Sequence, residues 1–268
     1  LKKGDKIHII SRQNSLDNLN VKFIGIKDFI NHLGEIKKIQ FDICYYFIAD
    51  NIIKKKIYNL NNSILNKLLP QIKDLNINKF VYFSSISLYE GLKQKTINSE
   101  LKIYPKSIYA NNKYFEENLL LKNLNFSTNI IFRIPMVIGR NMKSRIINYL
   151  KIYYKLRLYI FFNNKNCVIN YITIDKLVSN VNHILIIQKK TKIINLSYNI
   201  TFNSIYEKKN INFKINIFSE YFTKLIIIFK NIYLINKIHS FFFNEKIILA
   251  NYKNINFNND EKEFIKLL

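Results

Sequence analysis

The stretch that decides the fold is residues 80–113, FVYFSSISLYEGLKQKTINSELKIYPKSIYANNK. It begins with an apolar, aromatic run that ends in the hydroxyls of Ser84 and Ser85, and this pattern predicts a buried strand. After a polar loop, a helical pattern carries Tyr109 and Lys113, which are four residues apart and therefore share one helix face. Open α/β sheets bind ligands at the carboxyl ends of their strands, so these side chains are candidates for a site.

The chemistry of these side chains favours proton transfer. A phenol has an ordinary pKa of about 10, and a neighbouring ammonium such as that of Lys113 stabilises its phenolate. The hydroxyl of Ser85 can hold a substrate oxygen beside Tyr109. This set suits proton transfer at a carbinol or carbonyl carbon, coupled to hydride exchange with a nicotinamide. Two simpler interpretations stay open: Tyr109 and Lys113 as an exposed helix pair, and Ser84 and Ser87 as strand-end hydroxyls.

Strand and helix patterns alternate on both sides of this stretch. Strands are expected at residues 6–11, 21–26, 41–49, 79–85 and 128–135. Helices are expected at residues 27–40, 51–76 and 108–123. The run at 41–49 is continuously apolar, as in strands that are buried on both faces of a sheet. Strands that alternate with helices of this length predict βαβ units and a parallel sheet.

Beyond Pro135 the pattern loosens. A helix is expected near residues 142–157, a strand at 167–174, a helix from the N-cap Asp175 through Gln188, and a strand at 192–197. We find neither an internal repeat nor a linker rich in Pro, Gly or Ser. We therefore expect a smaller C-terminal lobe that packs on the sheet.

The chain is strongly basic, with 42 Lys and Arg against 18 Asp and Glu and a formal net charge of +24. Taken alone, this charge suggests a nucleic-acid or membrane-surface binder, which we keep as an alternative. Only five residues are arginines, however, although phosphate and base recognition gains most from Arg. A bias toward Asn, Ile and Lys runs along the whole length. We therefore expect a solvated, Lys-rich surface and no nucleic-acid partner.

Other features bear on location and on metals. Two cysteines, Cys44 and Cys167, cannot build a disulfide framework, and a reducing cytoplasm is expected. Charged residues interrupt the longest apolar stretch, 225–243, so it should form a core helix or a surface-lying amphipathic segment and should not span a membrane. No signal-peptide pattern is visible. The four histidines are scattered without metal-ligand spacing, so no metal is expected.

Taken in order, these motifs resemble the extended short-chain dehydrogenase/reductase family, in particular its NAD-dependent epimerase/dehydratase branch, which acts on nucleotide sugars. The resemblance spans roughly residues 1–200. Its motifs are KGDKIHIISR (3–12), FDICYYFIAD (41–50), VYFSSISLYEG (81–91), YANNK (109–113), IIFRIPMVIGR (130–140) and NYITIDKLV (170–178). The Tyr-x-x-x-Lys motif alone would mean little in a chain with 18 tyrosines, but here it lies between two matching strands.

The resemblance implies roles for particular residues. Tyr109 would be the general acid/base, and Lys113 would bind the nicotinamide ribose and lower the pKa of the tyrosine. Ser85 would orient the substrate oxygen, because it stands four residues before Tyr89 as the serine of the family does.

The cofactor would be NAD or NADP, and three further positions would contact it. Pro135 would line the nicotinamide pocket, and Ala49 would end the strand that precedes the cofactor. Arg12 favours the 2′-phosphate of NADP, although a plain surface arginine is also possible there.

The resemblance also implies a fold, an α/β Rossmann-like parallel sheet with a smaller C-terminal lobe. Residues 1–135 would form the dinucleotide-binding domain, and residues 136–268 the substrate-binding lobe and final sheet elements. The first strand and the glycine-rich phosphate turn of the family have no counterpart, and roughly 20 to 30 residues are expected to be missing at the front. The absent strand belongs between residues 6–11 and 41–49.

The expected function is that of an epimerase or 4-keto reductase on a nucleotide sugar. The stretch Ser85–Ser87 lacks the Thr-Asp-Glu of sugar 4,6-dehydratases, and Met136 stands where many epimerases place an Asn. These departures leave the sugar open. The alternative is a catalytically inactive or fragmentary family member without the phosphate-binding turn. A homodimer is a further possibility by analogy.

Overall fold

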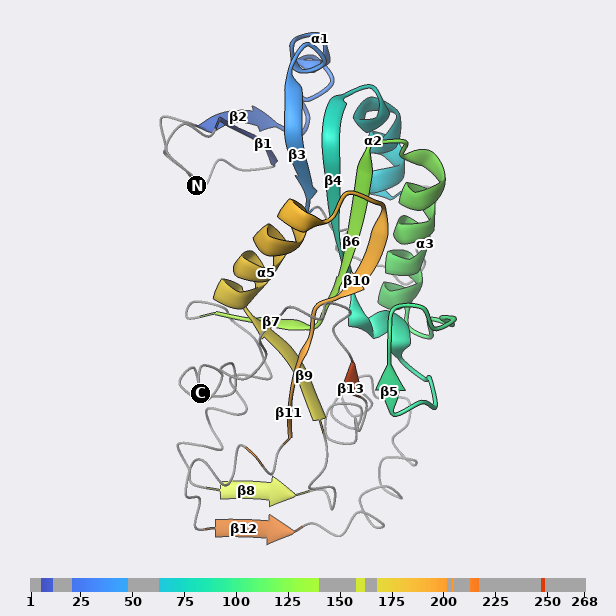
Figure 1. Ribbon diagram of the computed structural model, residues 1–268, viewed down its shortest axis with the longest axis vertical. Coiled ribbons are helices and arrows are strands. Elements are labelled where there is room, and N and C mark those ends of the chain that lie inside the picture. Colours follow the sequence, from blue (N-terminus) through green and yellow to red (C-terminus); the bar gives the residue numbers. More distant parts are fainter. Residues whose placement is uncertain are drawn as a thin grey trace.

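The computed structural model describes residues 6–11, 21–47, 63–139, 158–161, 168–201, 204, 213–216 and 247–248 (Figure 1). Its main sheet has the strand order β10-β6-β4-β3, and all neighbouring strands are parallel. These strands are β3 (Gln40–Tyr46), β4 (Asn76–Ser85), β6 (Thr128–Ile134) and β10 (Lys192–Asn195). The parallel α/β fold expected from the alternating patterns is confirmed.

Helices cover both faces of this sheet. Helix α2 (Ile64–Lys73) connects β3 to β4, and α3 (Ile108–Asn123) connects β4 to β6. Helix α5 (Ile174–Ile187) lies on the opposite side of the sheet (Figure 1). Alternate residues of β4 point to the two layers, because Val81 joins the cluster that contains α5 while Phe80 and Tyr82 join the cluster that contains α2 and α3.

The helix ends follow from local capping. The hydroxyl of Ser107 accepts a hydrogen bond from the backbone N–H of Ala110 at 3.2 Å and fixes the start of α3 at the position expected from the sequence. Helix α5 differs from the expectation. Its N-cap is Thr173, which makes no side-chain capping bond, and Asp175 lies in the first turn instead. A carboxylate in the first turn still favours the helix through the positive end of the helix dipole.

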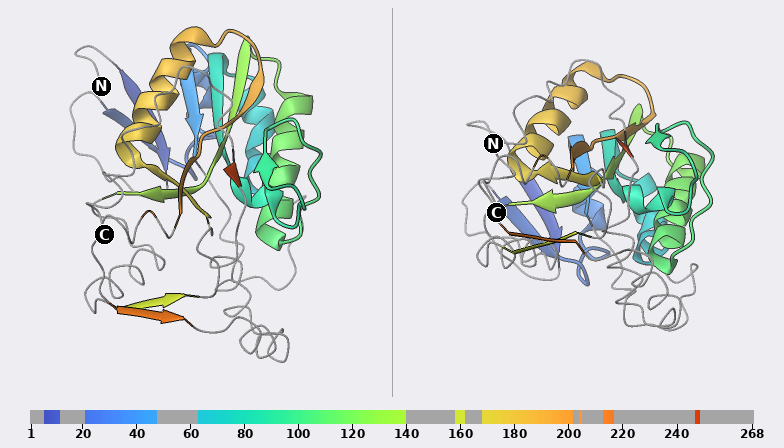
Figure 2. Two further views of the ribbon diagram at one scale, coloured as in Figure 1. Left: turned by 60° about the horizontal axis from the view of Figure 1, so that its bottom comes forward. Right: turned by 90° about the horizontal axis from the view of Figure 1, so that it is seen from below.

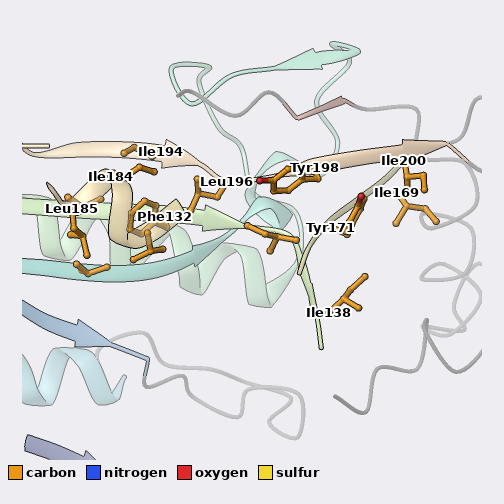
Figure 3. Close-up of a cluster of buried hydrophobic side chains, with 14 residues drawn as sticks. Phe132, Ile138, Ile169, Tyr171, Ile184, Leu185, Ile194, Leu196, Tyr198 and Ile200 are labelled. Carbon is orange, nitrogen blue, oxygen red and sulfur yellow. The ribbon is translucent and has the colours of Figure 1, made fainter. Parts of the chain in front are cut away.

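A second sheet follows directly on the first. It has the order β11-β9-β7 and is built from β7 (Met136–Ile138), β9 (Val168–Thr173) and β11 (Tyr198–Thr201). One buried cluster runs from Phe132 and Ile194 in the main sheet to Tyr171 and Tyr198 in the second (Figure 3). The two sheets therefore share a core. The division of the chain at residue 135 stays a prediction.

Short elements complete the described chain. The 3-10 helix η3 (Ile86–Tyr89) follows β4 directly. Strand β5 (Thr96–Ile97) pairs with β13 (Ile247–Ile248), and β8 (Leu158–Phe161) pairs with β12 (Phe213–Asn216), as Figure 2 shows from two further sides. The helix expected near 142–157 lies outside the described residues.

The main sheet is interrupted beside β3. Strands β1 (Ile7–Ser11) and β2 (Val21–Gly25) form a separate parallel pair, and within the described ranges no strand pairs with the second edge of β3. The rings of His8 on β1 and Phe41 on β3 contact each other edge to face, with centroids 5.4 Å apart. The two strand groups therefore meet through side chains without a shared ladder. This is the place where the sequence predicts an absent strand.

Two expectations for this region are wrong. The run at 41–49 was expected to be buried on both faces, yet Tyr45 is 39% exposed and Phe47 is 68% exposed. Tyr45 lies on β3 and Phe47 directly follows it, at the edge where the sheet has no neighbouring strand among the described residues. In place of the helix expected at 27–40, the structure has only the short helix α1 (Leu33–Ile36). Turns precede it, and one of them is closed by a hydrogen bond from the N–H of Asp28 to the carbonyl of Gly25. The poor helix formers in this segment explain the difference.

Candidate active site at the carboxyl end of strand β4

Ser85 lies where strand β4 ends and η3 begins. Its backbone is extended, with φ −137° and ψ 146°, and its hydroxyl accepts a hydrogen bond from the N–H of Ser87 at 3.2 Å. Serine favours this position because its hydroxyl can satisfy an N–H at the start of a helix. The half-buried hydroxyl therefore lies at the carboxyl edge of the parallel sheet.

Tyr109 approaches Ser85 from the first turn of α3. The hydroxyl of Ser85 lies close enough to Tyr109 to affect the pKa of its phenol, and the tyrosine is 43% exposed. Burial of part of the phenol raises the pKa of Tyr109, and the negative charge of Glu116 raises it further, whereas the neighbouring hydroxyl of Ser85 lowers it. The structure thus brings together two of the residues predicted from the sequence, and the phenol is protonated at neutral pH.

Lys113 lies one turn further along α3 and faces the sheet. Its ammonium donates to the hydroxyl of Tyr82 at 2.9 Å and to the carbonyl of Phe83 at 3.3 Å. It also forms an ion pair with Glu116, with 3.4 Å between Nζ and Oε2. Only 6% of the Lys113 side chain is exposed. Lys113 is therefore near Tyr109 in the sequence of the helix, but its charge is paired with a carboxylate.

A second buried ion pair lies next to the first. The guanidinium of Arg133, at the end of β6, donates to both carboxylate oxygens of Glu117 at 3.0 and 2.7 Å. It also donates to the hydroxyl of Tyr89 at 2.7 Å, and this hydroxyl donates to Asn195 on β10 at 2.7 Å. Four elements, namely η3, α3, β6 and β10, are thus fixed to one another at the edge that carries Ser85.

The two glutamates were not among the residues predicted from the sequence. Glu116 and Glu117 follow Lys113 at spacings of three and four residues, which places both on the face of α3 that Lys113 occupies. Two consecutive carboxylates with that spacing in a chain of only 18 acidic residues are the signal that could have found them. Arg133 lies within the motif IIFRIPMVIGR (130–140), which by itself predicts no role for this arginine.

The remaining predicted residues are partly outside the described chain. Pro135 is buried directly after β6, at the same edge as Ser85. Arg12 and Ala49 lie outside the described residues, so their predicted roles stay predictions. Within the part of the chain that the structure describes, no group of three His, Cys, Asp or Glu side chains could hold a metal ion. No described helix is both long and apolar enough to cross a membrane.

Comparison with known proteins identifies the fold. No protein-family model and no curated protein sequence matches the chain. Among solved structures, UDP-N-acetylglucosamine 4-epimerase from Bacillus cereus is similar with a TM-score of 0.59 and 14% identity, over 80% of this chain and 77% of that one. UDP-glucuronic acid 4-epimerase from the same organism, in complex with NAD, has a TM-score of 0.54 and 20% identity, over 76% and 73%.

A third solved structure agrees with these two. The Bordetella bronchiseptica enzyme WbmG, in complex with NAD, has a TM-score of 0.60 and 12% identity, over 77% of this chain and 69% of that one. At these identities the shared property is the fold. The chain therefore has the Rossmann-like α/β fold of the epimerase structures, as the sequence motifs led us to expect.

Proposed function

We propose that the chain is a member of the extended short-chain dehydrogenase/reductase family and acts on a nucleotide-linked sugar, as an epimerase or a 4-keto reductase. The observation that carries this proposal is the approach of Tyr109 to Ser85 at the carboxyl end of β4, with Lys113 one helical turn further along α3. The fold shared with UDP-sugar 4-epimerases supports the substrate class.

The side chains have distinct tasks in this proposal. Ser85 holds the substrate oxygen, and Tyr109 gives a proton to that oxygen or takes one from it. Because burial raises the pKa of Tyr109, the phenol carries its proton at neutral pH and acts first as an acid. This direction suits the protonation of an oxygen that becomes negative when its carbon is reduced.

The described residues fit one half of a nicotinamide dinucleotide. Tyr109, Lys113 and the buried Pro135 lie at the edge where the nicotinamide would meet the substrate, and the cofactor would supply hydride exchange when bound. The pyrophosphate half has no described counterpart, because no glycine-rich turn stands at the carboxyl end of a described strand. Arg12 would favour NADP over NAD.

The test uses the full chain with NAD⁺, NADPH and UDP-glucose as probes, in calorimetric binding and turnover assays. We expect UDP-glucose to bind and Tyr109→Phe to abolish turnover while it preserves the fold. The matched control is Tyr104→Phe, since Tyr104 is a nearby tyrosine that is 60% exposed. Equal activity of the Tyr109→Phe variant and the unmodified chain would refute the assignment of the acid.

A second candidate, a catalytically inactive family member, is favoured by the interruption between β1 and β3. The first strand of such sheets leads into the phosphate-binding turn, so an interruption at that place weakens dinucleotide binding. Binding of UDP-glucose without any binding of NAD⁺ or NADPH would support this candidate. A homodimer and a cytoplasmic location stay predictions.

A further inference from the structure

We propose that Tyr89 is a positioning residue, whose buried hydroxyl holds η3 in place and so fixes the direction in which the hydroxyl of Ser85 points. The inference rests on the proposed function, because Ser85 is the residue that holds the substrate oxygen there. Its test follows backbone N–H groups and needs neither cofactor nor substrate, so the two can fail separately.

Ser85 and Tyr89 stand at the two ends of one short turn. Ser85 is the N-cap of η3 and Tyr89 is its last residue, so their spacing matches the length of this turn. The N–H of Ser87 donates to the Ser85 hydroxyl at 3.2 Å, and the N–H of Glu90 donates to the carbonyl of Ser87 at 3.1 Å. Because the turn is bonded from one end to the other, a displacement of Tyr89 also displaces the N–H of Ser87.

The bond from Ser87 decides what the hydroxyl of Ser85 can offer to a ligand. A serine hydroxyl has one O–H donor and two lone pairs, and the N–H of Ser87 occupies one lone pair. The O–H and the second lone pair are left for other partners, among them the substrate oxygen of the proposed reaction. The side chain can rotate among its staggered rotamers, so the bond from Ser87 selects the one that the site uses.

The hydroxyl of Tyr89 anchors the far end of η3. Tyr89 is 2% exposed, and its hydroxyl accepts a hydrogen bond from Arg133 at 2.7 Å and donates one to Asn195 at 2.7 Å. The guanidinium also lies over the ring of Tyr89, 5.3 Å from its centroid. Arg133 is itself held by both carboxylate oxygens of Glu117 on α3. Tyr89 therefore joins η3 to β6, to β10 and, through Arg133, to α3.

The hydroxyl and the ring of Tyr89 have separable tasks. The ring packs in a buried cluster with Leu88, Ile97 and Ile248, and a phenylalanine ring would keep these contacts. The hydroxyl satisfies the amide oxygen of Asn195, a buried residue whose amide nitrogen has no hydrogen-bond partner among the described residues. Loss of the hydroxyl would therefore leave buried polar groups unpaired and loosen η3, while the packing stays.

The experiment is hydrogen exchange of the full chain labelled with ¹⁵N-serine, followed by NMR. The resonance of Ser87 is identified by its loss in Ser87→Ala, and that of Ser179, inside α5 on the other side of the sheet, by its loss in Ser179→Ala (Figure 1). Ser85→Ala should speed exchange at Ser87, because it removes the acceptor of this N–H. Tyr89→Phe should speed exchange at Ser87 by about three- to tenfold relative to Ser179, the change expected for one hydrogen bond.

The matched control is Tyr82→Phe. Both tyrosines are at most 2% exposed and both hydroxyls accept a hydrogen bond from a cation, which for Tyr82 is Lys113, but Tyr82 lies on β4 and outside η3. The control should leave the ratio of the exchange rates at Ser87 and Ser179 unchanged. A general loss of stability would raise both rates together and would leave this ratio unchanged as well.

Three results would overturn the proposal: an unchanged ratio in Tyr89→Phe, an equal rise in Tyr82→Phe, and an unchanged rate at Ser87 in Ser85→Ala. Should Tyr89→Phe fail to fold, as judged by circular dichroism, Asn195→Ala decides. That variant removes one of the two partners of the Tyr89 hydroxyl and leaves Arg133 in place. A higher ratio then supports the proposal, and an unchanged ratio contradicts it.

Discussion

The buried pair of Arg133 and Glu117 allows a quantitative prediction of stability. Its two N–O distances are 3.0 and 2.7 Å, and the exposed fractions of the two side chains are 3% and 2%. Glu117→Gln keeps the volume of the side chain but leaves a buried guanidinium without its counter-charge. Removing one partner of such a pair costs about 3 to 5 kcal/mol, a large part of the roughly 5 to 15 kcal/mol that stabilises a typical domain.

A surface pair with the same short distance provides the control. Lys37 and Asp74 are also 2.7 Å apart, but their side chains are 42% and 58% exposed. Asp74→Asn should therefore lower the free energy of unfolding by only about 0 to 1 kcal/mol, because water screens the charges. The contrast between the two variants isolates the effect of burial, since the distance and the type of substitution are matched.

The assay is urea unfolding followed by circular dichroism, with the slope m compared between variants. Equal losses for Glu117→Gln and Asp74→Asn would refute the reasoning. A further variant that replaces both members, Arg133→Met with Glu117→Leu, should lose less than Glu117→Gln alone, because it leaves no unpaired charge. A double variant that loses more than the single variant would show that packing, and not charge pairing, is the main contribution.

Two further predictions concern titration. Burial and the charge of Glu116 raise the pKa of Tyr82 well above its usual range, so the contribution of this phenol to stability is complete below pH about 10 and is lost as the pH rises further. The urea midpoint of the unmodified chain should therefore fall between about pH 9 and 11.5, and Tyr82→Phe should flatten this fall. An unchanged slope would contradict the prediction. Cys44 is half-buried, and desolvation raises the pKa of its thiol to about 12. In a Cys167→Ser background this thiol should therefore react with a disulfide reagent more slowly in the folded chain than in urea, and equal rates would contradict the raised pKa.

Much of the fold could be predicted because its signals are local. The helix expected at 108–123 is observed with the same bounds, since the hydroxyl of Ser107 caps its first turn. The strand expected at 128–135 is β6, one residue shorter. Both depend on neighbours within a few residues along the chain. The prediction of a helix at 27–40 was wrong because the apolar spacing of this segment does not offset its poor helix formers.

The candidate site was predictable only in part, because only some of its contacts follow from local signals in the sequence. Ser85 ends a strand and Tyr109 begins the next helix, so the sheet edge brings them together once the alternation of strands and helices is recognised. The contact of Lys113 with the sheet was not predictable in this way. The closest contacts of this lysine include Tyr82, which lies 31 residues earlier on the neighbouring strand. That pairing depends on which side of the helix packs against the sheet.

By itself, the sequence determined the parallel α/β architecture, the strand-end position of Ser85 and the shared helix face of Tyr109 and Lys113, because hydrophobic period and capping act over short distances. The tertiary structure decided where the charges go. It set Lys113 against Tyr82 of the sheet, joined Arg133 to three other elements, and left Tyr45 and Phe47 exposed at the interrupted edge. Those outcomes depend on contacts between segments far apart in the chain, and the spacing of residues along one segment carries no record of them.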